Sequence, residues 1–282
     1  MNRHLPYQPN LAYTDSDNKL IIKHSSGFYS CCTIRLRKII NWYNEHLKFP
    51  VVDSSRQWSM YKDEQCDITT RFFETTNSDF EYRPILFSFD TVEDQFSNYS
   101  MLNYNDTKIF VSKYFRISRE VNKIKLDLIK KYSIDLTNTI AVCHRGTDKK
   151  METGIPTNQE MFDKIDAIQT QYPTHKLLIQ SDEIEFMEAA IKKYPEFIYI
   201  KESPKVSKIL RAIQFHIPIS QRVQQAQIFL AIMQILSKSS KVILNSGNVG
   251  MWVCLFRNNF DGVSQYLNTS DSKRYTKDNW IN

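Results

Sequence analysis

The first fifty residues alternate between short apolar runs and one long stretch of helical periodicity. The run LIIK, at residues 20–23, predicts a strand that leads into the polar turn HSSGFYS. Apolar residues then recur at spacings of three and four from Leu36 to Leu47, which predicts a helix with one buried face. The segment FPVVDSS, at residues 49–55, predicts a short buried strand. Strand, helix and strand in this order indicate a βαβ unit.

The middle of the chain is less regular. Residues 56–105 show no clear period, but apolar residues at Ile117, Val121, Ile124 and Leu128 predict another amphipathic helix. We expect this helix to bridge two halves of the molecule. The predicted domain boundary follows it, giving an acceptor-side α/β domain at residues 1–135 and a second domain at residues 136–282.

From residue 140 onward, apolar strands and amphipathic helices alternate. Thr157 and Glu160 form a capping-box signature at the start of one of these helices. The predicted strands are TIAVCH (139–144), HKLLIQ (175–180), FIYI (197–200) and KVIL (241–244). The predicted helices follow Thr157 and span residues 182–194, 226–236 and 250–256. This alternation predicts a doubly wound parallel sheet.

The composition is that of a globular protein with two small cores. The chain has 282 residues, of which 41% are hydrophobic and 24% charged, so disorder is a poor interpretation. No apolar run approaches the roughly 18 residues of a membrane span, and the first residues lack the apolar core of a signal peptide. We therefore expect a cytoplasmic protein without a membrane span.

Charge, cysteines and histidines exclude several other classes. The net charge of +6 is spread along amphipathic segments, so nucleic acid is not an expected partner. The five cysteines form no CxxC pair, and the six histidines show neither HxH nor HExxH spacing. We expect reduced thiols and no metal site.

Ligands of open parallel sheets bind beyond the carboxyl ends of the strands. The string CHRGTDKK follows the predicted strand at 139–144 and supplies Arg145, Thr147, Asp148 and Lys149. A guanidinium in this position suits a charge-assisted, bidentate contact with a diphosphate. The alternative is structural, with Arg145 and Asp148 pairing only with each other.

Two other strand ends carry candidate binding residues. Ser181 and Asp182 suit a ribose or base contact, but Asp182 equally suits a helix cap before Glu185. Ser246, Gly247 and Asn248 begin a predicted helix, where free backbone amides and the helix dipole favour phosphate. That signal is weak by itself because Ser and Asn are also ordinary N-cap residues.

These motifs resemble those of the inverting GDP-fucosyltransferases of GT-B architecture, which include α-1,6, O-fucosyl and α-1,2 types. CHRGTDK is similar to that family's H-x-R-R-T-D-K string at Arg145, Thr147, Asp148 and Lys149. IQSDE and LNSGNVGMWVCLF resemble two later motifs, in the same order. The chain departs from the family pattern at Gly146, where the string has a second arginine, and at Cys143, where it has histidine.

The resemblance implies a fold and an activity. The fold is two Rossmann-like α/β domains with the donor on the C-terminal parallel sheet, and the activity is transfer of fucose from GDP-fucose to a glycan or glycoconjugate. Arg145 would contact the β-phosphate, Ser246, Gly247 and Asn248 would support the phosphates, and Asp182 would lie near the nucleoside. No cofactor is implied beyond the nucleotide sugar.

Inversion needs a base that takes the acceptor proton while the nucleotide leaves. Glu152 and Asp148 are the candidates, and a carboxylate from the N-terminal domain is the third possibility. Two other functions remain open at this stage. One is transfer of a different sugar from GDP or UDP, and the other is a nucleotide- or glycan-binding module without turnover.

Overall fold

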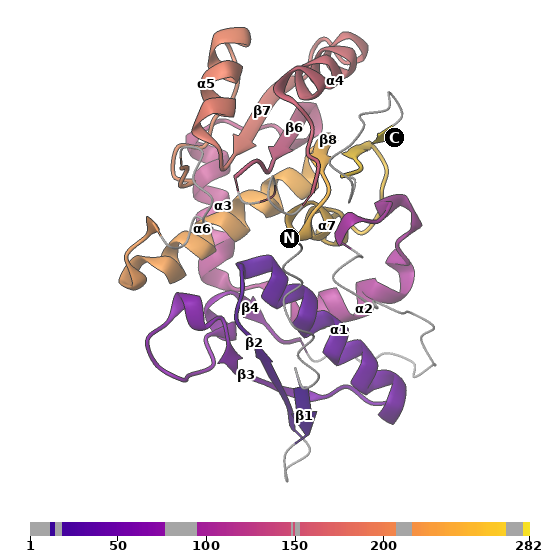
Figure 1. Ribbon diagram of the computed structural model, residues 1–282, viewed down its shortest axis with the longest axis vertical. Helices are drawn as coiled ribbons and strands as arrows, with labels where there is room; N and C mark the ends of the chain where they lie inside the picture. The colour runs from indigo at the N-terminus through magenta and orange to yellow at the C-terminus, as the bar shows by residue number, and fades with distance from the viewer. Residues whose placement is uncertain are drawn as a thin grey trace.

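The protein consists of two lobes stacked along the long axis, with helices between them (Figure 1). The computed structural model describes residues 12–14, 19–76, 95–147, 149, 153–206, 216–268 and 279–282. One contiguous set of buried apolar residues extends from Leu20 in the first lobe to Val263 in the second. The lobes therefore share a core, and the helices between them belong to both.

The N-terminal lobe contains a small sheet and the βαβ unit predicted from the sequence. Its strand order is β1-β2-β3, with β1 antiparallel to β2 and β2 parallel to β3. The elements are β1 (Ala12–Thr14), β2 (Lys19–His24), α1 (Phe28–His46) and β3 (Val51–Gln57). The strand β3 is less buried than predicted, because Val51 is 66% exposed.

Helix α1 buries most of the face that its apolar spacing predicts, including Leu36, Ile39, Ile40 and Tyr43. The prediction is wrong for Leu47, whose side chain is 47% exposed. Leu47 is the C-cap and has a left-handed backbone with φ of 51°, which turns it away from the helix face.

Short elements and two helices connect the lobes. Helix α3 buries Val121 and Leu128 and contacts α6, so it bridges the halves as predicted, although Ile117 lies before it in a strand. The hydroxyl of Ser118 accepts from the Val121 amide and caps α3. These connecting elements are η1 (Ser59–Tyr61), η2 (Thr69–Arg71), β4 (Phe73–Glu74), η4 (Tyr99–Met101), α2 (Tyr104–Tyr114), β5 (Arg116–Ile117), α3 (Arg119–Lys131) and η5 (Leu136–Asn138).

The second lobe is built on a five-stranded, mostly parallel sheet with the order β10-β9-β8-β6-β7. Only the pairing of β10 with β9 is antiparallel. The strands are β6 (Thr139–His144), β7 (Lys176–Ser181), β8 (Lys241–Asn245), β9 (Val263–Tyr266) and β10 (Trp280–Ile281). The predicted α/β sheet with parallel strands is thus confirmed.

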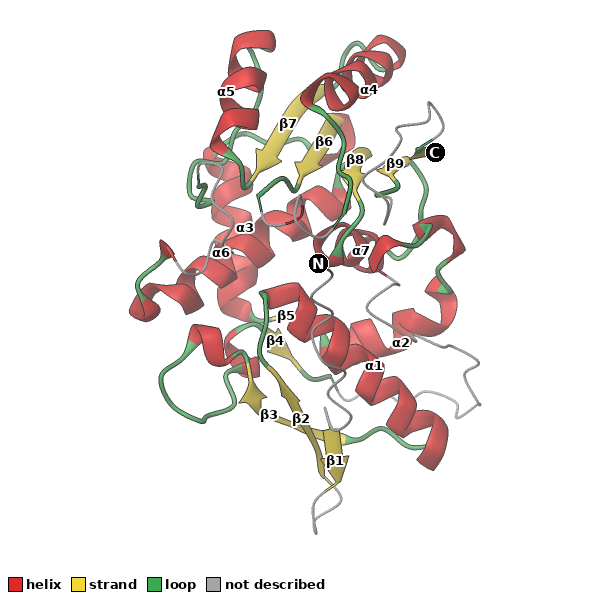
Figure 2. Cartoon of the chain, viewed as in Figure 1, coloured by secondary structure: helices red, strands yellow, loops and turns green. Residues whose placement is uncertain are grey.

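Helices cover both faces of this sheet (Figure 2). They are α4 (Asn158–Gln171), α5 (Ile184–Lys193), α6 (Ile219–Lys238) and α7 (Asn248–Arg257). Alternation along β6 explains the two layers. Ile140 and Val142 pack into the cluster of α4 and α5, whereas Ala141 and Cys143 pack into the core that contains α6 and α7.

The local signal for the start of α4 was correct, but the predicted start of α6 at residue 226 and one predicted strand were wrong. The capping box of Thr157 and Glu160 is present at the start of α4. The segment 197–200, predicted as a strand, forms only one isolated bridge, between Ile198 and Leu178. Two backbone hydrogen bonds tie Ile198 to β7, from its N–H to Leu177 O and from the Ile179 N–H to its carbonyl.

Candidate active site

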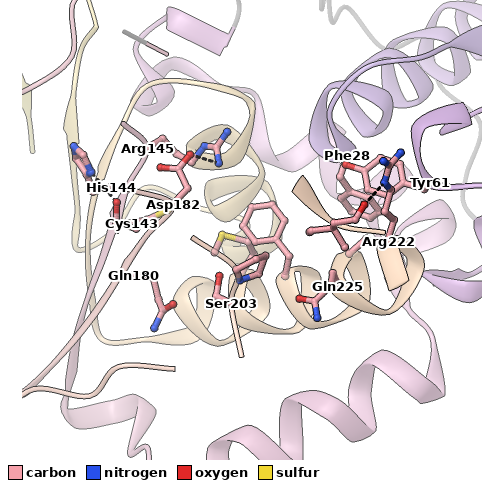
Figure 3. A pocket seen from close by; sticks show the side chains of 16 residues that line it. Phe28, Tyr61, Cys143, His144, Arg145, Gln180, Asp182, Ser203, Arg222 and Gln225 are labelled. Carbon is pink, nitrogen blue, oxygen red and sulfur yellow. Dashed lines mark hydrogen bonds and ion pairs between the residues drawn. The ribbon is translucent and has the colours of Figure 1, made fainter. Parts of the chain in front are cut away.

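A pocket lies between the carboxyl ends of β6 and β7, helix α6 and the N-terminal lobe (Figure 3). Arg145 and Asp182 line it from the sheet, and Phe28 and Tyr61 line it from the N-terminal lobe. The site therefore forms at the end of the parallel sheet, where ligands of such folds bind, and it draws on both lobes.

An ion pair fixes the guanidinium of Arg145 in this pocket. Its Nη1 lies 2.6 Å from Asp182 Oδ2, and the Arg145 side chain is 17% exposed. The Arg145 backbone is also fixed, because its N–H donates to Asn245 Oδ1 at 2.9 Å and its carbonyl accepts from Asn245 Nδ2 at 3.1 Å. Asn245 ends β8, so the neighbouring strand positions Arg145.

Asp182 holds the β6–α4 loop rather than capping a helix. Its carboxylate accepts from the Gly146 N–H at 2.9 Å and from the Thr147 hydroxyl at 2.7 Å, in addition to the contact with Arg145. Burial raises the pKa of this carboxyl, but Arg145 and the two hydrogen bonds outweigh burial and hold the pKa below its usual range. The N-cap residue of α5 is Glu183, so the helix-cap interpretation of Asp182 is wrong.

Gly146 is required by its neighbours. A Cβ atom at this position would lie 2.7 Å from His144 Cε1 and would clash with the Glu183 carboxylate. Glu183 is only 2% exposed, so it cannot swing into solvent. The loop therefore has no room for the second arginine of the family motif.

The side chains of Cys143 and His144 point to opposite faces of the sheet and pack in different layers. The His144 ring stacks on Phe186 at a centroid distance of 3.9 Å, and its Nδ1 lies 3.0 Å from the Ser181 hydroxyl. Ser181 also accepts from the Glu183 N–H at 3.1 Å. Burial raises the pKa of Cys143 to about 12, so this thiol is not a nucleophile at neutral pH.

The start of α7 lies at the same sheet edge, but protein groups occupy its polar atoms. Ser246 is 0% exposed, and its hydroxyl donates to Tyr266 O at 3.1 Å and accepts from Gln265 Nε2 at 2.8 Å. The Gly247 N–H donates to the Tyr99 hydroxyl at 2.8 Å. Neither residue lines the pocket that contains Arg145.

Lys149 and Asn248 both donate to the side-chain oxygen of Gln95, and neither residue lines the pocket. Lys149 Nζ donates to Gln95 Oε1 at 3.1 Å, and Asn248 Nδ2 donates to the same oxygen at 2.9 Å. Lys149 also lies 5.3 Å from the centroid of the Phe96 ring, and its side chain is 8% exposed. Asn248 Oδ1 accepts from the Thr33 hydroxyl at 2.7 Å.

The two proposed base residues, Asp148 and Glu152, lie outside the described residues. The pocket also contains residues that the sequence did not single out: Gln180 on β7, and Arg222 and Gln225 on α6. Arg222 Nη1 donates to Met60 O at 2.8 Å and links α6 to the N-terminal lobe. Gln180 carried a signal, because it is a polar residue near the end of an otherwise apolar strand.

Metal ligands do not cluster in the described ranges, where no group of three His, Cys, Asp or Glu side chains could hold an ion. Across those same ranges, no helix has the length and apolar character needed to cross a membrane.

Two lobes around a pocket at the carboxyl end of a parallel sheet define an α/β protein whose pocket lies where ligands of such folds bind. No family model and no curated protein sequence matches the chain. Solved structures do match. An α-1,6-fucosyltransferase, NodZ, whose crystal was soaked with GDP-fucose, superposes with a TM-score of 0.54 at 12% identity, covering 84% of this chain and 91% of that chain.

A second structure, fucosyltransferase NodZ from Bradyrhizobium, superposes with a TM-score of 0.54 at 11% identity, over 87% of this chain and 94% of that one. At this identity the likeness establishes a common fold. At the level of the fold, this likeness agrees with the resemblance to the GDP-fucosyltransferases that the motifs indicated.

Proposed function

We propose that this protein is a glycosyltransferase that uses a nucleoside diphosphate sugar and binds its diphosphate through Arg145. The observation that carries the proposal is the position of this guanidinium, which lines a pocket at the carboxyl end of a parallel sheet while Asp182 fixes its orientation. A planar guanidinium held in one geometry suits bidentate contact with phosphate oxygens. The shared fold with NodZ supports the same class.

The finer proposal is transfer of fucose from GDP-fucose to a glycan or glycoconjugate, with inversion. As the bond to the nucleotide breaks, negative charge grows on the leaving diphosphate and the sugar gains oxocarbenium character. Arg145 stabilises the leaving charge. Asp148 or Glu152 takes the proton of the acceptor hydroxyl.

The proposed architecture is GT-B, with a division near residue 135. The N-terminal lobe faces the acceptor, and residues 136–282 hold the donor. Phe28 and Tyr61, which reach the pocket from the first lobe, support an acceptor side there. Thr147 contributes to the site through its hydrogen bond to Asp182. The cytoplasmic location inferred from the sequence stays a prediction.

Calorimetric titration with GDP, UDP and their sugars, followed by a donor-hydrolysis assay, tests this function. We expect a GDP sugar to bind and to be hydrolysed slowly without acceptor. Arg119→Ala is the matched control, because Arg119 is exposed and does not line the pocket. Hydrolysis of a UDP sugar instead would change the donor but keep the class.

A binding module without turnover is the second candidate. It is favoured by the hydrogen bonds that occupy Ser246 and Gly247, because they leave fewer groups for the phosphates. Tight binding of GDP with neither hydrolysis nor transfer would support it.

We also propose that transfer needs no metal, since Arg145 supplies positive charge at the diphosphate. Activity should survive EDTA. Activity that is lost on chelation and restored by manganese would contradict this part of the proposal.

A further inference from the structure

A buried amide in the pocket has no hydrogen-bond partner in the part of the chain that the structure describes. Gln180 lies on β7, is 4% exposed and lines the pocket, and among the described residues neither its amide nitrogen nor its oxygen has a hydrogen-bond partner. Burying an amide without hydrogen bonds destabilises a folded protein. The pocket therefore retains a polar group that a ligand can satisfy.

The position of Gln180 connects it to Arg145. Gln180 pairs in register with Cys143 on the parallel strand β6, so both side chains point to the same face of the sheet. Arg145 follows two residues later, which is ~7 Å further along the strand direction. In Figure 3, Gln180 and Gln225 lie along one edge of the pocket and Arg145 and Asp182 along the other.

The surroundings of Gln180 suit a flat ring. Helix α6 covers this face with Phe229 and Met233, and Pro204 contributes a further apolar wall. Apolar walls with a few convergent polar groups are typical of pockets that bind aromatic rings such as nucleobases. Gln225 Oε1, also on α6, is a second buried acceptor without a partner among the described residues.

Charged groups in the pocket do not compete for that ring. The carboxylate of Asp182 is bound to Arg145, Thr147 and Gly146. Arg222 donates to Ile217 O and to Met60 O. Gln180 and Gln225 therefore offer neutral amide groups to a base.

We propose that Gln180 hydrogen-bonds the base of the nucleotide and that it does so with little selectivity. This inference rests on the proposed function, because Arg145 must hold the diphosphate. A carboxamide has an acceptor oxygen beside a donor NH₂, and it can rotate to present them in either order. It can pair with guanine, whose edge offers a carbonyl next to an N–H, and with adenine, whose edge offers an amino group next to a ring nitrogen. No protein bond fixes its orientation among the described residues.

Titration of the wild type and two variants tests this inference, with GDP, IDP, ADP and inorganic pyrophosphate as ligands. The wild type should bind GDP, IDP and ADP within about tenfold of each other. Gln180→Leu should weaken all three by about tenfold, and it should leave pyrophosphate binding unchanged. Its Tm should rise by about 2–4 °C, because an unsatisfied amide is removed.

Gln180→Glu should create selectivity. A carboxylate only accepts hydrogen bonds, so it matches the two adjacent donors of guanine and opposes the acceptors of adenine. The preference for GDP over ADP should grow by about tenfold or more, and IDP, which lacks the 2-amino group, should not share the full gain. Gln224→Leu, an exposed change on α6, is the control for loss of an amide.

Three outcomes would overturn the inference. Unchanged nucleotide affinity in Gln180→Leu would mean that Gln180 does not contact the base. A wild-type preference for GDP over ADP above about 100-fold would show that another group selects the base. Failure of the wild type to bind every nucleotide and pyrophosphate would instead refute the proposed function, and this inference with it.

Discussion

The end of β6 and the start of α7 lie at one edge of the same sheet and both carry polar residues, but their polar groups face different partners. At β6, Arg145 lines the pocket and Asp182 fixes it. At α7, Ser246 and Gly247 bond to Tyr266, Gln265 and Tyr99. A helix start attracts anions only where its amides remain open. A Ser-Gly-Asn string at a helix start can therefore hold neighbouring elements of the fold together instead of binding phosphate.

Paired substitutions test this difference most strongly. Arg145→Ala should lower the transfer rate by about 100-fold or more and weaken GDP binding, because phosphate loses a charge-assisted contact while leaving charge develops. Ser246→Ala should lower the free energy of unfolding by about 1–3 kcal/mol, because buried partners lose a hydrogen bond, and it should leave kcat nearly unchanged. Kinetics and urea unfolding on the same preparations measure both.

Arg145→Lys refines this test. Lysine keeps the charge but loses the planar fork, so it should restore only part of the rate. Near-normal turnover in Arg145→Ala, or a Ser246→Ala protein that is folded but inactive, would reverse the roles assigned to the two ends. An unfolded Arg145→Ala protein would indicate that the ion pair is mainly structural.

The sequence predicted what depends on neighbours along the chain. The apolar run of β6, which predicted a buried strand, and the capping box at Thr157 are local signals, and both were correct. Ser246 could not be interpreted in this way, because its partners, Tyr266 and Gln265, come from another strand. Tyr99, which occupies the Gly247 amide, comes from residues 56–105, where no period was visible. Local patterns therefore placed the sheet edge but not the groups that remain open to a ligand.

Asp182→Asn probes how firmly the β6 end is held. The variant should lose about 2 kcal/mol of unfolding free energy at pH 7, because the carboxylate makes a charged contact and two hydrogen bonds. The pKa of Asp182 is lowered in the folded protein, so its ionisation stabilises the fold above the unfolded-state pKa of about 3.9. That contribution is lost as the pH falls below about 4 toward the folded pKa.

The measurement is urea unfolding of the wild type and Asp182→Asn at pH 7, 5 and 3. The difference between the two proteins should be largest at pH 7 and 5 and should shrink at pH 3. A difference that stays constant across this range would mean that the ion pair with Arg145 does not lower the pKa of Asp182.

Gly146→Ala makes the smallest expected change and tests the packing of the loop that carries Arg145. The new methyl group would lie against His144 Cε1 and the Glu183 carboxylate, both of which are buried, so the loop must shift. We expect the free energy of unfolding to fall by about 1 kcal/mol. The loss in GDP affinity should be proportionally larger than this loss in stability, because the Gly146 N–H and the Arg145 guanidinium both bind the Asp182 carboxylate. Gly27→Ala is the control: a Cβ there meets no atom of the described residues within 4 Å, and GDP affinity should be unchanged. Equal GDP affinity in both variants would show that the loop tolerates a side chain. The absence of the family's second arginine would then need another cause than the Glu183 carboxylate.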